Sequence, residues 1–284
     1  MRNIYCGIAD MRKQVFAEVA RLAYEGGDYH RVDKLPHKIL PDEPGNERDS
    51  IFLERAIVAE RIRLAMGHSL RSASHQEPLS DAADKTAIRE RYYEPPLINI
   101  IKYACHACPD THYEVSNACQ SCLARHCSNA CPKGAISFLH GRAEIDQNKC
   151  IKCGKCKAAC SYQAIIRFER PCQEACGMDA IGADENGKAI INQDKCVSCG
   201  QCIVACPTGA LAEKDQTQDV LKLLADPSKT VIVQTAPATR VTIGEAFGMP
   251  IGTNAEGKMV AALRRLGFAK VFDTNFAADL TIME

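Results

Sequence analysis

The spacing of the cysteines constrains this chain more than any other feature of its sequence. Sixteen of the seventeen cysteines lie between Cys105 and Cys206. Two runs share the spacing C-x2-C-x2-C-x3-C; they consist of Cys150, Cys153, Cys156 and Cys160, and of Cys196, Cys199, Cys202 and Cys206. This spacing is typical of the thiolates that hold [4Fe–4S] clusters in bacterial ferredoxins. It predicts a segment that binds iron–sulfur clusters, moves single electrons and belongs in a reducing, oxygen-poor (anaerobic) setting.

Composition bears on the class of partner and on how the chain can be stabilised. Lys and Arg together number 35, as do Asp and Glu, so net charge gives no case for nucleic acid or an anionic membrane as a partner. Trp is absent and aromatic residues make up only 6% of the chain. Apolar core is therefore scarce, and clusters can replace it because metal–ligand free energy contributes to folding.

Disulfides and zinc sites are the two other common uses of many cysteines. The first 22 residues carry charges at Asp10, Arg12, Lys13 and Glu18, which excludes the apolar region of a signal peptide, and no later stretch approaches 18 uninterrupted apolar residues. We therefore expect a cytoplasmic protein without membrane insertion, where disulfides are rare. Zinc sites commonly use isolated C-x2-C pairs, whereas runs of four cysteines favour iron–sulfur clusters.

An internal repeat indicates duplicated modules. The last cysteine of each run begins the pattern C-x-x-x-A-[I/L], whose ends are Ala135-Ile136, Ala164-Ile165, Ala180-Ile181 and Ala210-Leu211. Residues 143–165 and 189–211 also align without gaps at an offset of 46 residues. We expect these alanine-containing pairs to wall the clusters, with backbone N–H groups bonded to sulfur.

In two-cluster ferredoxins, three cysteines of one run bind one cluster and the fourth binds the other. For the inner pair of runs, this rule predicts cluster 1 on Cys119, Cys122, Cys127 and Cys160, and cluster 2 on Cys150, Cys153, Cys156 and Cys131. The first of these runs is irregular, because four residues separate Cys122 from Cys127.

The outer cysteines complete two further sets. Cluster 3 is predicted on Cys196, Cys199, Cys202 and Cys176, and cluster 4 on Cys105, Cys108, Cys172 and Cys206. The run that begins at Cys105 is then split, with the inner module inserted into it. Four clusters use sixteen cysteines and leave Cys6 as a structural thiol. The nearby histidines are expected to be loop residues rather than ligands; they are His106, His112, His126 and His140.

The segment before the cysteines is predicted to be helical. A first helix covers about residues 8–22 and ends near Gly26-Gly27, and a second covers 51–66, with Asp49 or Ser50 as its N-cap and Gly67 as its stop. A loop between them is marked by Pro36, Pro41, Pro44 and Gly45. The charged run Glu54, Arg55, Glu60, Arg61 and Arg63 indicates a solvated helix face.

After the cysteines, the pattern is that of an α/β domain. We expect helices over 215–225, 241–247 and 256–266, a short buried strand over 230–234, a second strand over 270–273, and a further helix from Ala277. Gly267 closes the helix before the second strand. Sites in such folds form at the carboxyl ends of strands, here 235–240 and 273–276. Because two parallel strands do not make a stable sheet, we expect that the chain is incomplete at Glu284.

Residues 233–248 and 257–284 closely resemble the opening of the catalytic domain of [FeFe] (iron-only) hydrogenases. The resemblance implies a parent enzyme that interconverts H2 with protons and electrons at an H-cluster. The ferredoxin-like clusters would carry electrons to or from that H-cluster. It also implies that Ala236, Pro237 and Ala238 line the H-cluster pocket. The family's active-site cysteine motifs are absent from this sequence, so the resemblance implies no catalytic residue and no activity for this chain alone.

The expected fold is α+β, with a helical N-terminal region (1–96), four-cluster ferredoxin-like modules (97–213), a helix and linker (214–229), and the incomplete hydrogenase domain (230–284). Within the modules, the inner one (119–165) is inserted in the outer one (105–108 and 172–211). The expected partner is a soluble redox protein, a ferredoxin or similar, or another oxidoreductase subunit. Two alternatives stay open: a stand-alone polyferredoxin electron-transfer subunit, and a hydrogenase-like protein of iron–sulfur assembly or sensing.

Overall fold

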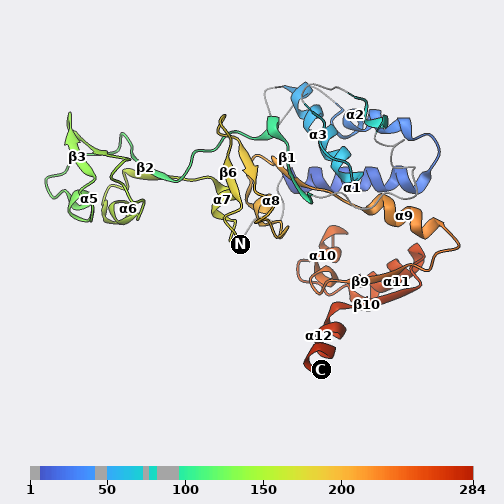
Figure 1. The fold of residues 1–284 in the computed structure, drawn as a ribbon. Helices are drawn as coiled ribbons and strands as arrows, with labels where there is room; N and C mark the ends of the chain where they lie inside the picture. Colours follow the sequence, from blue (N-terminus) through green and yellow to red (C-terminus); the bar gives the residue numbers. More distant parts are fainter. Residues whose placement is uncertain (1–6, 42–49, 73–76, 82–95, 284) are drawn as a thin grey trace.

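A computed structural model describes residues 7–41, 50–72, 77–81 and 96–283. It combines helices with five two-stranded sheets. Figure 1 shows a helical region, a segment of short strands that extends away from it, and a final part that contains α9 to α12. No helix among the described residues is long and apolar enough to cross a membrane.

The helical region is formed by α1 (Gly7–Glu25), η1 (Tyr29–Lys34), α2 (Leu35–Ile39) and α3 (Ile51–Ala65). Both predicted helices are confirmed, and the Ser50 side chain caps α3 by accepting a hydrogen bond from the Leu53 N–H. Their shared core includes Val15, Val58 and Ile62, each at most 1% exposed. The other proposed cap, Asp49, lies outside the described residues, as do Pro44, Gly45 and Cys6.

Two predictions about this region are wrong. Pro36 lies inside α2 rather than in a loop, because the first turn of a helix tolerates proline. The charged side of α3 is not solvated, since Glu54, Glu60 and Arg61 are only 3%, 2% and 5% exposed. Helix α3 contacts α1 and also β8 (Leu211–Glu213), so it is covered on more than one side.

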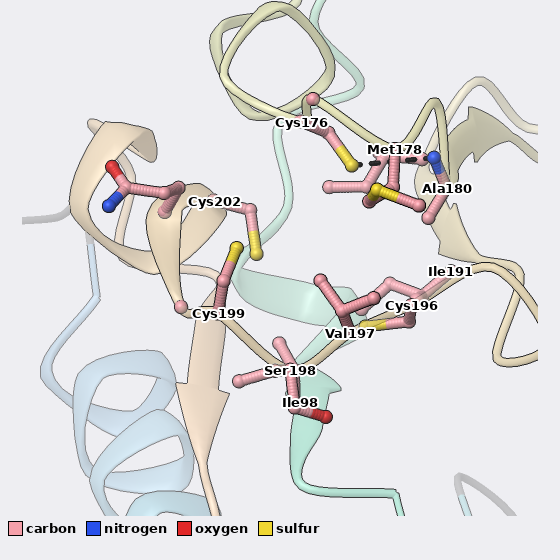
Figure 2. A pocket seen from close by; sticks show the side chains of 14 residues that line it. Ile98, Cys176, Met178, Ala180, Ile191, Cys196, Val197, Ser198, Cys199 and Cys202 are labelled. Carbon is pink, nitrogen blue, oxygen red and sulfur yellow. Dashed lines mark hydrogen bonds between the residues drawn. The ribbon is translucent and has the colours of Figure 1, made fainter. Parts of the chain in front are cut away.

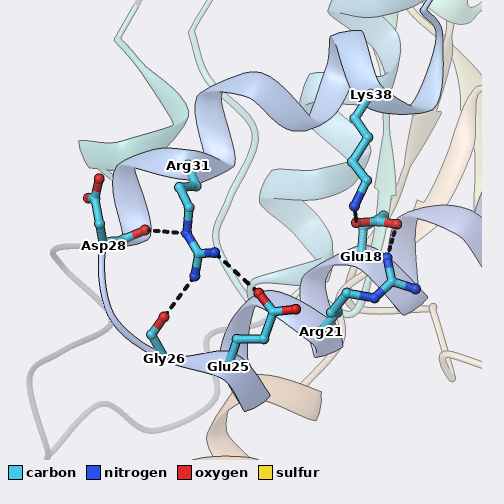
Figure 3. Close-up of polar contacts among 7 residues, drawn as sticks. All are labelled: Glu18, Arg21, Glu25, Gly26, Asp28, Arg31 and Lys38. Atoms are coloured by element: carbon cyan, nitrogen blue, oxygen red, sulfur yellow. Dashed lines mark hydrogen bonds and ion pairs between the residues drawn. The ribbon is translucent and has the colours of Figure 1, made fainter.

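Polar contacts compensate part of this burial. The Arg71 Nε donates to the Glu60 carboxylate at 2.5 Å, and the Arg61 guanidinium donates to the carbonyl oxygen of Gly209. On the outer side of the region, Lys38 and Arg21 both donate to Glu18, as Figure 3 shows. These bonds tie α1 to α2, and α3 to the cysteine-rich segment.

Short elements make up the cysteine-rich segment. They are β1 (Ile98–Ile100), η2 (Lys102–Ala104), β2 (His112–Val115), α5 (His126–Asn129), β3 (Ile136–Leu139), β4 (Arg142–Ile145), α6 (Lys155–Ala159), β5 (Ile165–Phe168), α7 (Pro171–Glu174), β6 (Ile181–Ala183), β7 (Ala189–Ile191), α8 (Gln201–Ala205) and β8. All four strand pairs are antiparallel: β1 with β8, β2 with β5, β3 with β4, and β6 with β7.

One succession of elements occurs twice in this segment. A strand is followed by a short helix, a hairpin, a second short helix, and a strand that pairs with the first. Strands β2 and β5 bracket one copy, in which α5 contacts α6; β1 and β8 bracket the other, in which α7 contacts α8. All of the first copy lies, in sequence, between β1 and α7 of the second. In Figure 1 the β2–β5 copy lies at the end of the molecule far from α1 to α3.

The final part contains α9 (Thr217–Ala225), β9 (Ile232–Thr235), α10 (Thr239–Ala246), α11 (Glu256–Leu266), β10 (Lys270–Asp273) and α12 (Thr274–Met283). These elements confirm the predicted order, and β9 pairs with β10 in parallel. Gly267 ends α11 with φ +107°, as expected for a helix-closing glycine. The prediction that the first strand is buried is wrong: Ile232 is 54% exposed, because this small sheet is incompletely covered.

Candidate metal centres

Four thiols surround a cavity in the β1–β8 copy. Cys196 and Cys199 come from the loop before α8, Cys202 from α8 itself, and Cys176 from the turn after α7. Figure 2 shows these four side chains around the same space, with Ile98 and Ile191 close by. The structure thus brings together the four cysteines predicted for cluster 3.

The β2–β5 copy holds an equivalent cavity. Its thiols are those of Cys131, Cys150, Cys153 and Cys156, the set predicted for cluster 2. The wall is again apolar and is made of Tyr113, Ala135, Ile136, Ile145 and Ile151. Two cavities of similar lining, in two copies of one succession of elements, indicate the same kind of site.

Some of the remaining cysteines lie close enough to their predicted partners for the thiols to affect each other's pKa. Burial raises the pKa of Cys127, and the nearby thiols of Cys160 and Cys122 raise it further. These three belong to the set predicted for cluster 1. The fourth, Cys119, accepts a hydrogen bond from the Ala143 N–H at 3.4 Å.

The same holds for the set predicted for cluster 4. Burial, then the thiols of Cys206 and Cys108, raises the pKa of Cys172 to about 11. Burial also raises the pKa of Cys202 to about 11, with further contributions from Cys172 and Cys196, so the two outer sets adjoin each other. Thiols with such pKa values are protonated at neutral pH, and metal binding must release their protons.

The repeated alanines have a defined role in this geometry. The N–H of Ala135, Ala164, Ala180 and Ala210 each donates to the sulfur of the cysteine four residues earlier, at 3.3–3.4 Å. The same four side chains are only 1–3% exposed. The predicted N–H bonds to sulfur are therefore confirmed, and Ala180 and Ala135 also line the two cavities.

This donor set fits an iron–sulfur cluster. Cysteine thiols converge on apolar cavities, and backbone N–H groups point at the sulfurs, which are the features that hold and tune such clusters. Within the described ranges, no three His, Cys, Asp or Glu side chains are grouped around a point as ligands of one metal ion; the thiols are instead distributed around the cavity walls (Figure 2).

Of the four nearby histidines, only His106 and His140 lie in loops or turns; the prediction is wrong for His112, which is in β2, and for His126, which begins α5. His106, His126 and His140 are exposed. His112 stacks on Phe168 with ring centroids 5.0 Å apart, and its ring nitrogens contact the Asp110 carbonyl at 2.7 Å and the Glu114 carboxylate at 3.0 Å.

Of the residues assigned by resemblance to the H-cluster pocket, Ala236 lines a cavity beside the carboxyl ends of β9 and β10. Thr235, Arg240 and Asp273 line it as well. Pro237 and Ala238 follow in the turn before α10 and are exposed. The cavity lies where strand ends of an α/β sheet form sites.

Sequence reasoning missed two kinds of contributor to these sites. Tyr113 and Ile98 line the two cysteine cavities from strands distant in sequence from the cysteines, and no local pattern marks them. Gly154 and Gly200 precede α6 and α8 with φ +76° and +75°, a left-handed backbone that glycine adopts readily. They occupy equal positions in the 46-residue repeat, and this signal could have identified them.

Comparison with known proteins agrees with this geometry. Residues 142–165 and 189–212 match families described as 4Fe-4S binding domains. Residues 229–284 match the family described as the iron only hydrogenase large subunit, C-terminal domain.

Three relatives are hydrogenases by name. The NADP-reducing hydrogenase subunit HndD of Solidesulfovibrio fructosivorans is 63% identical over 78 residues, 28% of this chain and 13% of the relative. Iron hydrogenase 1 of Clostridium pasteurianum is 44% identical over 156 residues, 54% of this chain and 27% of the relative. The periplasmic [Fe] hydrogenase large subunit of Nitratidesulfovibrio vulgaris is 42% identical over 153 residues, 54% of this chain and 33% of the relative.

The chain thus spans a third or less of the length of these relatives. The cytoplasmic location expected from the sequence stays a prediction, and one relative is periplasmic by name. The resemblance inferred from the sequence is confirmed: this chain joins 4Fe–4S binding domains to a segment of an iron-only hydrogenase large-subunit domain.

Proposed function

We propose that this chain holds four [4Fe–4S] clusters in two nested ferredoxin-like modules. We also propose that it carries electrons between a soluble redox protein and the H-cluster of an iron-only hydrogenase, where H2 is interconverted with two protons and two electrons. The observation that carries the proposal is the repeated succession of elements, each copy with two sets of four cysteines. The matched hydrogenase segment follows this array in sequence, after α9.

The nested arrangement is supported by equivalent hydrogen bonds in the two copies. The Ala143 N–H donates to Cys119 in the inner copy, and the Ala189 N–H donates to Cys105 in the outer copy at 3.5 Å. Cys105 therefore occupies the position of the first cysteine in a run, although Cys172 of the same run lies 67 positions later in the chain. The pairing of β2 with β5, in which His112 lies opposite Phe168, brings the two parts of the split run together.

In this proposal the protein supplies ligands, a dry environment and hydrogen bonds. Backbone N–H groups at the sulfurs stabilise added negative charge and so favour the reduced cluster. The buried alanines and isoleucines exclude water from the same sulfurs. When bound, each cluster supplies a one-electron redox centre, and several centres in one small segment provide a path for electrons.

Iron and sulfide analysis tests the number of clusters. An anaerobically reconstituted chain should contain about sixteen iron and sixteen sulfide, four of each for every set of four cysteines. About eight of each would contradict the outer pair of clusters.

The grouping of the outer cysteines is tested by two single variants and their combination. Cys108→Ala and Cys172→Ala should each lower the iron content to about twelve, and the double variant should lower it no further, because both thiols are proposed to hold one cluster. Cys160→Ala is the matched control and should remove an inner cluster instead, with a different loss in the electron paramagnetic resonance spectrum. A double variant with about eight iron would show that Cys108 and Cys172 serve different clusters.

A further inference from the structure

Charge is unevenly divided between the two copies of the ferredoxin-like succession. Residues 112–168, the inner copy, contain eight Lys and Arg against three Asp and Glu. Residues 171–213, which hold most of the outer copy, contain two against six. The inner copy is therefore positive by five, and this part of the outer copy is negative by four.

The clearest difference lies in the loop and helix around Cys153. Lys152, Lys155 and Lys157 correspond, at the offset of 46 residues, to Ser198, Gln201 and Ile203. The backbones are alike, since Lys152 and Ser198 have φ of +57° and +55°. The outer cavity thus reaches the same geometry without these lysines, so neither the fold nor a cluster's negative charge requires them.

Helices α6 and α8, which differ in these lysines, also differ in their surroundings. Ile203 in α8 is only 7% exposed because it packs in the core shared with α3 and β1. Its counterpart Lys157 in α6 is exposed. Figure 1 places α6 at the end of the molecule far from the helical region and from α9 to α12.

A cysteine cavity is also accessible from solvent at this end of the molecule. The Cys153 side chain is exposed, and Ile151 lines the cavity while it remains 54% exposed. Among the described residues, no carboxylate forms an ion pair with Lys152, Lys155 or Lys157. These unpaired cations make a positive surface around Ile151 and Cys153, which is complementary to a negatively charged partner.

We propose that the face formed by Ile151, Lys152, Cys153, Lys155 and Lys157, here named the basic face, docks an acidic one-electron carrier protein. This inference rests on the proposed function and adds to it the surface and the charge of the partner. One electron leaves the reduced carrier, which becomes oxidised, and reduces the centre held next to Cys153. Opposite charge steers the encounter and accelerates association, most strongly at low ionic strength.

The test replaces the three lysines by neutral residues, two of them taken from the equivalent positions of the outer copy, as Lys152→Ser, Lys155→Gln and Lys157→Gln together. The rate of reduction by a reduced, acidic two-cluster ferredoxin is measured by stopped flow at low and high salt. We expect the second-order rate constant of the triple variant to fall about tenfold or more at low salt, and the difference to disappear at high salt.

A matched control removes the same amount of charge elsewhere, at the exposed lysines Lys229, Lys258 and Lys270, each changed to Gln. Its rate constant should change less than about twofold, because these lysines lie far from the basic face. Equal decreases of the rate constant in both triple variants would overturn the proposal, because they would show that only the net charge of the protein matters. Unchanged rates in the first variant would overturn it as well.

Two further measurements separate this inference from the proposed function. Iron content and reduction by dithionite must be the same in the wild type and both variants; wild-type protein without clusters would refute the proposed function itself. Sedimentation at low salt tests whether the acidic outer copy of a second chain occupies the face. If the wild type forms a dimer that the lysine changes abolish, the basic face binds a second copy of this chain rather than a carrier protein, and the proposal is overturned.

Discussion

Gly154 and Gly200 offer a sharp test of how the two cysteine cavities are built. They occupy equal places in the repeat and have nearly equal φ, +76° and +75°. A Cβ added at Gly200 would meet no atom within 4 Å, whereas a Cβ at Gly154 would lie 2.8 Å from the hydroxyl oxygen and 3.5 Å from Cζ of Tyr113. Both alanine variants therefore place a side chain on a left-handed backbone, and only the variant at Gly154 adds a close contact, with Tyr113.

The magnitudes follow from these two terms. An alanine in the left-handed region costs about 1–2 kcal/mol at either position. At Gly154 the forced contact adds about 1–3 kcal/mol, because Tyr113 is only 6% exposed and packs in a core with Ile136 and Ile165. Tyr113→Phe removes the oxygen and leaves an ordinary contact, so Gly154→Ala in that background should cost no more than Gly200→Ala.

The assay is the thermal midpoint at which cluster absorbance is lost, measured for the wild type, both glycine variants, Tyr113→Phe and the Tyr113→Phe/Gly154→Ala double variant. For a domain of 60–100 residues, 1 kcal/mol corresponds to about 4–8 °C. Gly154→Ala should lower the midpoint about twice as far as Gly200→Ala, and the double variant should recover the difference. Equal effects of the two alanines, or no recovery with phenylalanine, would refute the packing argument.

Two other predictions concern polar contacts. Burial alone would raise the pKa of Glu18, but hydrogen bonds from Lys38 and Arg21 outweigh it and hold that pKa below 4.5. Glu18→Gln should therefore lower the free energy of unfolding by about 1 kcal/mol at neutral pH, as measured by denaturant titration. The difference between wild type and variant should persist above pH 4.5 and vanish as the pH falls through the lowered pKa. A difference that is unchanged at pH 2–3 would contradict this prediction. Arg170, 3% exposed, donates to the Gly187 carbonyl at 2.9 Å and to Asp110 at 3.1 Å. Arg170→Met should cost about 2–3 kcal/mol and lower the thermal midpoint of the outer clusters first; an unchanged midpoint would contradict this structural role.

Local patterns predicted most of the secondary structure. The helices capped by Ser50 and closed by Gly267 could be predicted because capping depends on residues next to one another in sequence. The failures lie where burial depends on distant partners. Glu54 and Arg61 have the spacing of a solvated face, but α3 is covered by α1 and β8, and no pattern within α3 shows that contact.

By itself, the sequence determined the chemistry of the cysteine sites. Thiol spacing and the repeated C-x-x-x-A pattern are local features, and each turn that aims an alanine N–H at a cysteine sulfur closes within four residues. The tertiary structure alone decided which strands close around those turns, how Tyr113 and Ile98 complete the cavities, and which copy is covered by the helical region. The physical reason is that a turn depends on neighbouring residues, whereas burial depends on residues brought together only when distant strands such as β1 and β8 pair.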